Sequence, residues 1–190
     1  MNGPVVKICG IQRPEMARSA WAAGADFLGL VLTPSRRQVT VEQAREIVEG
    51  APGRYIAVFD DAPMLTTAER IIAEVPLYGV QWHGSAAPGW PRWLHDHGLL
   101  AVTTDLTVAD ADVWLLDNPQ PGSGQVWSWR LPKTGGPYWL AGGLRPDNVC
   151  ELVARLKPAG VDVSSGVERN GEKAVDLIEQ FVREAKRCNP

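Results

Sequence analysis

Two residues at the ends of apolar segments have side chains that could transfer protons. Cys9 closes the segment 5–9, and Asp117 closes the segment 113–117. A thiolate can act as a base where nearby cations lower the pKa of the thiol. A carboxylate is costly to bury without a partner or a role, so Asp117 is a candidate general acid or base. A lone cysteine in an apolar segment is often structural, so the residue type leaves both interpretations of Cys9 open.

A second group of residues suits the binding of a phosphate group. Phosphate is bound by backbone N–H groups that no side chain covers, preferably at the start of a helix. A Gly-Gly turn before a predicted helix and a Ser-Ser-Gly turn further along the chain both offer such donors. Either alone could be an ordinary turn, but their occurrence in consecutive units favours phosphate binding. The candidate phosphate-binding residues are Gly142, Gly143, Ser164, Ser165 and Gly166.

Polar residues after other apolar segments are candidate substrate contacts. Arg36 and Arg37 follow the segment 27–32. They could be a solvated pair, or a clamp for a carboxylate, which a guanidinium group matches in geometry. His83 and Asp162 lie at the ends of two further segments. His83 could equally be a structural histidine with no contact to substrate.

These candidates need elements that bring them together, and eight apolar segments, often rich in β-branched residues, predict those elements. Continuous hydrophobicity is typical of strands that are buried on both faces of a parallel sheet. The predicted strands span residues 5–9, 27–32, 55–59, 79–81, 99–102, 113–117, 138–141 and 161–163.

Helical patterns lie between most of these strands. Residues 40–49 begin with Thr40 and have Gln43 three positions later, which is a capping-box signature. Apolar residues repeat at helical spacing over 65–75 and most clearly over 174–185.

Strands that alternate with helices fit either a (β/α)8 barrel or a doubly wound sheet. The near-regular spacing, with no Gly-rich dinucleotide loop after the first strand, favours an α/β protein with a single (β/α)8 TIM barrel over residues 1–190. Residues 103–112 are too few for a full helix, so the helix after strand 5 is predicted to be shortened or missing. Residues 118–133 are expected to form a long loop with a helical turn near 127–131. The active site of such a barrel lies at the carboxyl ends of its strands, where the candidate residues fall.

The composition narrows the classes of function. With 45% hydrophobic residues among 190 and a net charge of −3, the chain is neither disordered nor basic like a general nucleic-acid binder. No apolar run reaches the roughly 18 residues of a membrane span, and the start of the chain has no signal-peptide pattern. Cys9, Cys150 and Cys188 are odd in number and widely spaced. We therefore expect three free thiols, no metal site and a cytoplasmic protein.

Taken in chain order, the polar motifs resemble the signature series of the phosphoribosylanthranilate isomerase family. The resemblance implies a (β/α)8 enzyme of tryptophan biosynthesis that needs no cofactor. Its reaction would be the Amadori rearrangement of N-(5-phosphoribosyl)anthranilate to 1-(2-carboxyphenylamino)-1-deoxyribulose 5-phosphate, an aldose–ketose isomerisation. The motifs are KICGI at 7–11, PSRR at 34–37, VQWHG at 80–84, LLD at 115–117, GSG at 122–124, AGGLRPDNV at 141–149 and DVSSGVE at 162–168.

The resemblance also implies roles for single residues. Asp117 would be the general acid that protonates the ribose ring oxygen, and Cys9 the general base that removes the C2′ proton. Arg37, rather than Arg36, would contact the substrate, facing its anthranilate carboxylate, and the two glycine- and serine-containing turns would hold the phosphate. His83 and Asp162 are expected to contact the substrate as well. The implied partner is a phosphorylated small molecule, and the expected state is a monomer or homodimer.

Three departures from the family pattern keep other interpretations open. Residues 100–104 replace a Lys-Ala-x-x-Val-like segment, and Trp82 replaces a leucine. A third departure is the loop after the second strand, which is about one residue shorter than in many relatives. One alternative is the related isomerase of histidine biosynthesis, or a dual-substrate version of it. Such enzymes have aspartate at the position of Cys9, which argues against them. The other alternative is a non-catalytic sugar-phosphate binding protein, which only the substitutions near strand 5 support.

Overall fold

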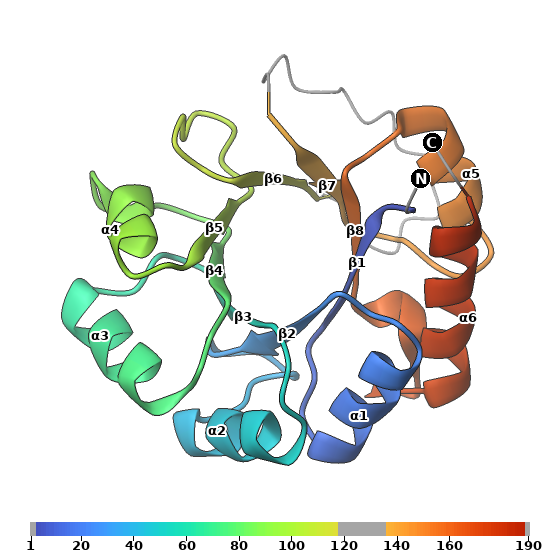
Figure 1. Cartoon of the computed structure of the whole chain (residues 1–190), viewed down its shortest axis with the longest axis horizontal. Helices are drawn as coiled ribbons and strands as arrows, with labels where there is room; N and C mark the ends of the chain where they lie inside the picture. The colour runs from blue at the N-terminus through green and yellow to red at the C-terminus, as the bar shows by residue number, and fades with distance from the viewer. Residues whose placement is uncertain (1–2, 118–135, 189–190) are drawn as a thin grey trace.

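The computed structural model describes residues 3–117 and 136–188, and it contains a closed barrel of eight parallel strands in chain order (Figure 1). Every strand pairs with its two sequence neighbours, and β1 pairs with β8 to close the ring. The strands are β1 Val5–Cys9, β2 Phe27–Val31, β3 Tyr55–Phe59, β4 Gly79–Trp82, β5 Leu100–Thr103, β6 Val113–Leu116, β7 Tyr138–Leu140 and β8 Gly160–Val163. The predicted (β/α)8 barrel is therefore confirmed, and each predicted strand coincides with an observed one to within one or two residues.

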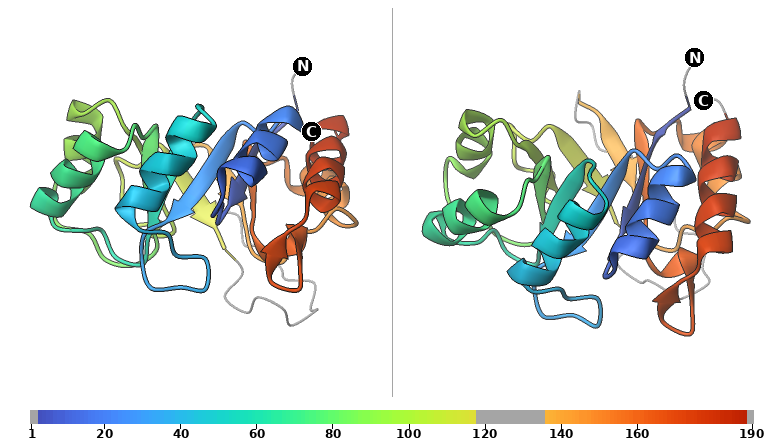
Figure 2. Two further views of the ribbon diagram at one scale, coloured as in Figure 1. Left: turned by 90° about the horizontal axis from the view of Figure 1, so that it is seen from below. Right: turned by 60° about the horizontal axis from the view of Figure 1, so that its bottom comes forward.

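Helices surround the barrel on its outside (Figure 1). They are α1 Pro14–Ala22, α2 Val41–Gly50, α3 Leu65–Glu74, α4 Trp90–Asp96, α5 Val149–Leu156 and α6 Val175–Arg187. After β8 the chain forms a short 3-10 helix, Ser165–Val167, and a hairpin of two short antiparallel strands, β9 Glu168–Arg169 and β10 Glu172–Lys173. Figure 2 shows this hairpin and the loop after β2 extending from the same end of the barrel.

The amphipathic pattern explains how the helices attach to the barrel. Helix α6 buries Ile178, Phe181, Val182 and Ala185, the residues that repeat at helical spacing in the sequence. These side chains join the outward-facing residues of β1, such as Ile8, in one apolar layer between strands and helices. At about 25 cal/mol for each Å² of apolar surface removed from water, this layer is a major source of the barrel's stability.

The predicted absence of a helix after β5 is also confirmed. Residues 104–112 contain no helix and are closed by local hydrogen bonds instead. The Asp112 carboxylate accepts a 2.7 Å bond from the backbone N–H of Ala101 and lies 2.9 Å from His95 Nε2. The Trp114 indole donates to the Val108 carbonyl at 3.2 Å. The predicted loop at 118–133, with its helical turn and the GSG motif, lies outside the described residues.

The expectation of three free thiols is wrong for two of the cysteines. Cys150 and Cys188 form a disulfide, with their Cα atoms 5.3 Å apart. They are 38 positions apart in the sequence, but α5 and α6 are neighbours on the outside of the barrel, so the second residue of α5 meets the residue that follows α6. Among the described residues, Cys9 is the free cysteine.

Within residues 3–117 and 136–188, none of the helices combines the length and the apolar character that crossing a membrane requires.

The start of α2 provides a test of how the sequence specifies its helices. The Thr40 hydroxyl accepts a hydrogen bond from the Gln43 N–H at 3.2 Å, and the Gln43 side chain accepts one from the Thr40 N–H at 2.8 Å. The variant Thr40→Ala removes the first bond, so we expect a loss of about 1 kcal/mol in the free energy of unfolding. Chemical denaturation measures this loss. The control Thr66→Ala, at an exposed position inside α3, should differ from the parent by less than about 0.5 kcal/mol. Equal losses in both variants would contradict the capping assignment.

Candidate active site

A cavity of about 270 Å³ opens at the carboxyl ends of the barrel strands. Parallel strands that close into a ring all end at one mouth, so residues far apart in the sequence meet there. The structure brings all the residues predicted for the site to the wall of this one cavity. They are Cys9, Arg37, His83, Asp117, Gly142, Gly143, Asp162, Ser164, Ser165 and Gly166.

Cys9 lies at the floor of the cavity, with 9% of its surface exposed. Its neighbours include the apolar side chains of Val31 and Val58. Burial raises the pKa of the Cys9 thiol above its usual value, and the ammonium group of Lys7 opposes this effect. A thiol in an apolar setting is a poor base unless a cation stabilises its charged form. Lys7, two residues earlier on the same strand, is that cation.

Asp162 on β8 forms an ion pair with Lys7, with 2.9 Å between the Lys7 Nζ and one carboxylate oxygen. Both groups are buried. The second carboxylate oxygen, Oδ1, is also buried and has no hydrogen-bond partner among the described residues. Since Asp162 also lines the cavity, it connects the interior ion pair with the space where a substrate would lie.

Backbone geometry explains the glycines of the predicted phosphate site. Gly142 and Gly143 have φ angles of 74° and 73°, in the left-handed region that side chains disfavour. The Asn148 amide group donates to the Gly143 carbonyl at 3.0 Å and so fixes the turn before α5. At Gly166, an added Cβ would overlap the Leu144 carbonyl oxygen. The backbones of the two turns are therefore in direct contact, with no room for a side chain at Gly166. Together the two turns form one wall of the cavity.

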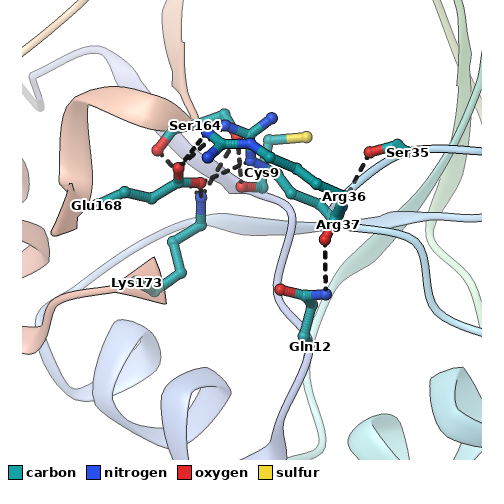
Figure 3. Close-up of polar contacts among 8 residues, drawn as sticks. All are labelled: Cys9, Gln12, Ser35, Arg36, Arg37, Ser164, Glu168 and Lys173. Atoms are coloured by element: carbon teal, nitrogen blue, oxygen red, sulfur yellow. Dashed lines mark hydrogen bonds and ion pairs between the residues drawn. The ribbon is translucent and has the colours of Figure 1, made fainter. Parts of the chain in front are cut away.

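A carboxylate that the sequence did not single out organises the charged rim of the site. Glu168 accepts hydrogen bonds from Arg37 at 2.6 and 3.0 Å, from Arg36 at 2.6 Å and from Lys173 at 2.7 Å (Figure 3). Lys173 also donates to the Ser164 carbonyl at 3.0 Å. We call Glu168 with these three cations the Glu168 cluster. Three positive charges against one negative charge leave a positive surplus, which suits the binding of an anion nearby.

The Glu168 cluster also distinguishes the two arginines. Arg36 is 56% exposed and does not line the cavity, whereas Arg37 is 20% exposed and does. The Arg37 side chain passes over Gly10, where an added Cβ would lie 2.5 Å from the Arg37 Cδ. Gly10 therefore leaves the space in which the aliphatic part of the Arg37 side chain lies. Arg37 is the arginine that can reach a bound anion.

The end of β4 adds an amide and an imidazole to the cavity. The Gln81 Nε2 lies 2.9 Å from the His83 Nε2, and the Thr104 hydroxyl donates to the His83 carbonyl at 2.7 Å. Trp82, between them, is buried against Trp90 of α4, with 6.3 Å between the ring centroids. The described residues that line the cavity include neither Trp82 nor any residue of β5. These two departures from the family pattern thus lie outside the cavity lining, whereas the loop after β2 contributes Ser35 and Arg37 to it.

Sequence reasoning missed Lys7, Gln81, Glu168 and Lys173 as parts of the site. Lys7 shares the inward face of β1 with Cys9, and this alternation was a usable signal. Glu168 closes the motif DVSSGVE, but two of its three partners, Arg36 and Arg37, lie 132 and 131 positions away. Such long-range pairs leave no local pattern in one sequence.

The closed eight-stranded barrel, with a thiol, a carboxylate and two glycine- and serine-containing turns at the carboxyl ends, defines a (β/α)8-barrel enzyme. The family model described as N-(5'phosphoribosyl)anthranilate (PRA) isomerase matches residues 6–184. The N-(5'-phosphoribosyl)anthranilate isomerase of Streptococcus pneumoniae is 38% identical over 190 residues, which cover 95% of each chain. The chain therefore belongs to the N-(5'-phosphoribosyl)anthranilate isomerase family.

Solved structures agree with this assignment. The phosphoribosyl anthranilate isomerase of Thermotoga maritima is 30% identical, with a TM-score of 0.83 over 96% of this chain and 98% of that one. The enzyme of Thermus thermophilus is 33% identical, with a TM-score of 0.76 over 95% and 97%. A third structure holds reduced 1-(o-carboxyphenylamino)-1-deoxyribulose 5-phosphate; it is 31% identical, with a TM-score of 0.83 over 96% and 98%.

The Glu168 cluster predicts a stability that depends on pH. Burial alone would raise the pKa of Glu168, but the hydrogen bonds from Arg37 and Lys173 lower it to about 2, from an ordinary value of 4.5. The stabilisation is therefore complete above pH 4.5 and is lost as the pH falls toward 2. The variant Glu168→Gln should lower the free energy of unfolding by roughly 2–3 kcal/mol at neutral pH. Thermal or chemical unfolding as a function of pH measures both effects.

The matched control is Glu172→Gln in the same hairpin. The ion pair of Glu172 with Arg13 is exposed on both sides, so its loss should change stability by less than about 1 kcal/mol. The difference between parent and Glu168→Gln should shrink as the pH falls below 4.5. If the difference in the free energy of unfolding stays constant down to pH 2, the charge of Glu168 is not what stabilises the contact of the β9–β10 hairpin with the loop after β2.

Proposed function

We propose that this chain catalyses the Amadori rearrangement of N-(5-phosphoribosyl)anthranilate to 1-(2-carboxyphenylamino)-1-deoxyribulose 5-phosphate, with Asp117 as the general acid and Cys9 as the general base. The observation that carries the residue roles is that Cys9 and Asp117 line the same cavity as the two anion-binding turns. The reaction is an internal transfer of hydrogen, so one acid and one base are sufficient.

The first step opens the ribose ring. The Asp117 carboxyl group, at the end of β6, donates a proton to the ring oxygen while the bond from this oxygen to C1′ breaks. The anthranilate nitrogen supplies the electron pair that forms the C1′=N bond, which gives a protonated Schiff base. Asp117 is exposed at the cavity mouth, where it can recover a proton from solvent for the next turnover.

The second step removes the proton from C2′. The Cys9 thiolate accepts this proton, and the electrons of the C–H bond form a C1′=C2′ double bond as the iminium nitrogen takes the other pair. The product is an enolamine, which tautomerises to the 2′-ketone. The substrate has gained one proton and lost another, so its composition is unchanged.

Three groups of residues hold the substrate in this proposal. The turns at Gly142–Gly143 and Ser164–Gly166 bind the phosphate through backbone N–H and hydroxyl groups. Arg37 uses the edge of its guanidinium group that Glu168 leaves open to pair with the anthranilate carboxylate. Asp162 and His83 contact the ribosyl hydroxyl groups from the cavity wall. The relative whose structure holds a reduced, phosphorylated product analogue supports a ligand of this class.

The proposal includes the setting in which the enzyme works. We assign residues 1–190 to one catalytic domain in the cytoplasm, as a monomer or a homodimer. One solved structure from Thermotoga maritima is of monomers generated from a dimeric phosphoribosylanthranilate isomerase. Cys9, at the position where the histidine-pathway isomerase has aspartate, supports the tryptophan-pathway reaction over that alternative.

The loss of substrate fluorescence on conversion tests both residue roles. Asp117→Asn and Cys9→Ser should each lower kcat by about 10²–10⁴-fold, the usual contribution of a positioned acid or base. The controls are Asp110→Asn, an exposed carboxylate in the loop between β5 and β6, and the double variant Cys150→Ser/Cys188→Ser, both distant from the cavity. These should keep the parent kcat.

Each outcome bears on one part of the proposal. If the parent chain does not turn over the substrate, the activity itself is wrong. Should Cys9→Ser keep more than a tenth of the parent kcat, the base is another group. The same result for Asp117→Asn would remove Asp117 as the acid.

A further inference from the structure

Lys7 is a lysine inside the barrel, with no exposed surface. Side chains alternate along a strand, so Lys7 and Cys9 face the barrel interior while Ile8, between them, faces the helices. An ammonium group is costly to bury, and a barrel interior is normally filled by branched apolar residues. The position of Lys7 therefore calls for a function beyond packing.

The partners of Lys7 keep it charged. The β1–β8 register places Asp162 directly beside Lys7, and their side chains form a 2.9 Å ion pair. Burial alone would lower the pKa of Lys7, but Asp162 and Cys9 together raise it above its ordinary value. Lys7 is thus an ammonium ion at neutral pH.

The same ammonium group lies close to Cys9. The charge of Lys7 favours the ionised form of the Cys9 thiol and so lowers its pKa, against the effect of burial. Gly29, opposite Cys9 on β2, makes room for both groups. A Cβ added at Gly29 would lie 2.8 Å from the Cys9 Sγ and 3.2 Å from the Lys7 Nζ. The absence of a side chain at Gly29 allows the thiol and the ammonium group to share this space.

We propose that Lys7 is a positioning residue that holds the Cys9 thiolate in place during catalysis, and that Asp162 sets how much of the Lys7 charge Cys9 receives. This inference rests on the proposed function, in which Cys9 is the base. When Cys9 loses its proton, Val31 and Val58 offer no countercharge, so the ammonium group of Lys7 supplies it. Lys7 does not line the cavity and acts only through Cys9.

Several charged groups act on Cys9, and the two with the largest effects on its pKa, Lys7 and Asp162, act in opposite directions. Burial raises the pKa of the Cys9 thiol, Lys7 lowers it, Asp162 raises it and Lys173 of β10 lowers it. The other titratable residues that line the cavity are Arg37, Asp60, His83 and Asp117. Loss of Lys7 and loss of Asp162 should therefore move the ionisation of Cys9 in opposite senses. If the two substitutions acted only by disturbing the packing, they would not shift the ionisation of Cys9 in opposite directions.

The experiment measures the reactivity of the Cys9 thiol in the substrate-free enzyme. In a Cys150→Ser/Cys188→Ser background, Cys9 is the sole cysteine in the chain. The rate of its alkylation by iodoacetamide follows the thiolate fraction, so the rate against pH gives an ionisation midpoint. Lys7→Met should raise this midpoint by about one pH unit or more, and Asp162→Asn should lower it. Lys186→Met, which breaks an ion pair with Asp26 on the outside of the barrel, is the control and should leave it unchanged.

An unchanged midpoint in folded Lys7→Met, or shifts of the same sign in both variants, would overturn the proposal. If Lys7→Met does not fold, Asp162→Asn decides: a lower midpoint supports the proposal, and an equal or higher one overturns it. The alkylation needs no turnover, so it is separate from the test of the proposed function. If Cys9→Ser remains active while the midpoints shift as expected, Cys9 is not the base, and the catalytic part of this proposal falls with that role. The control of the Cys9 thiol by Lys7 and Asp162 then stands by itself.

Discussion

The ion pair between Lys7 and Asp162 connects the closure of the barrel to its chemistry. The two residues lie 155 positions apart, on the first and last strands, and become neighbours only when β1 pairs with β8. A charge inside a closed barrel is stable only beside its partner. The strand register that completes the fold therefore also completes the surroundings of Cys9. The same register brings the Ser164 hydroxyl to the Cys9 carbonyl at 3.1 Å. This hydrogen bond joins the residue predicted to be the base to one of the two turns predicted to bind phosphate.

The charges at the site are arranged in two levels. In the interior level, the Lys7 cation pairs with the Asp162 anion, and in our proposal the balance between these two charges sets the ionisation of the Cys9 thiol. At the rim, the Glu168 cluster keeps a positive surplus beside the cavity. The positive rim attracts a negatively charged ligand, while the opposite charges of Lys7 and Asp162 offset each other in the interior. Neither Trp82 nor the helix-free segment after β5 contributes a residue to these two levels or to the cavity lining.

Much of the fold and of the cavity could be predicted from the sequence because their signals are local. Buried parallel strands produce continuous apolar segments, and Thr40 with Gln43 marks the start of a helix within four residues. The absence of a full helix after β5 follows from the small number of residues between β5 and β6. Lys7 escaped prediction despite the alternation of side chains along β1, whereas the Glu168–Arg37 pair and the disulfide depend on contacts between distant segments. Glu168 meets Arg37 from the opposite end of the chain, and Cys150 meets Cys188 only because α5 and α6 pack together.

The disulfide divides the chain into two topologically different parts. It closes a covalent loop from Cys150 to Cys188, and this loop contains β8, the Ser164–Gly166 turn and the β9–β10 hairpin. A cross-link of this size restricts the unfolded chain by about 3–4 kcal/mol in the loop-entropy account. Asp162, Ser164, Glu168 and Lys173 thus stay tethered to one another when the barrel opens. The part of the site that follows strands 1 to 7 lies outside this covalent loop, and it meets the looped part only when the sheet closes.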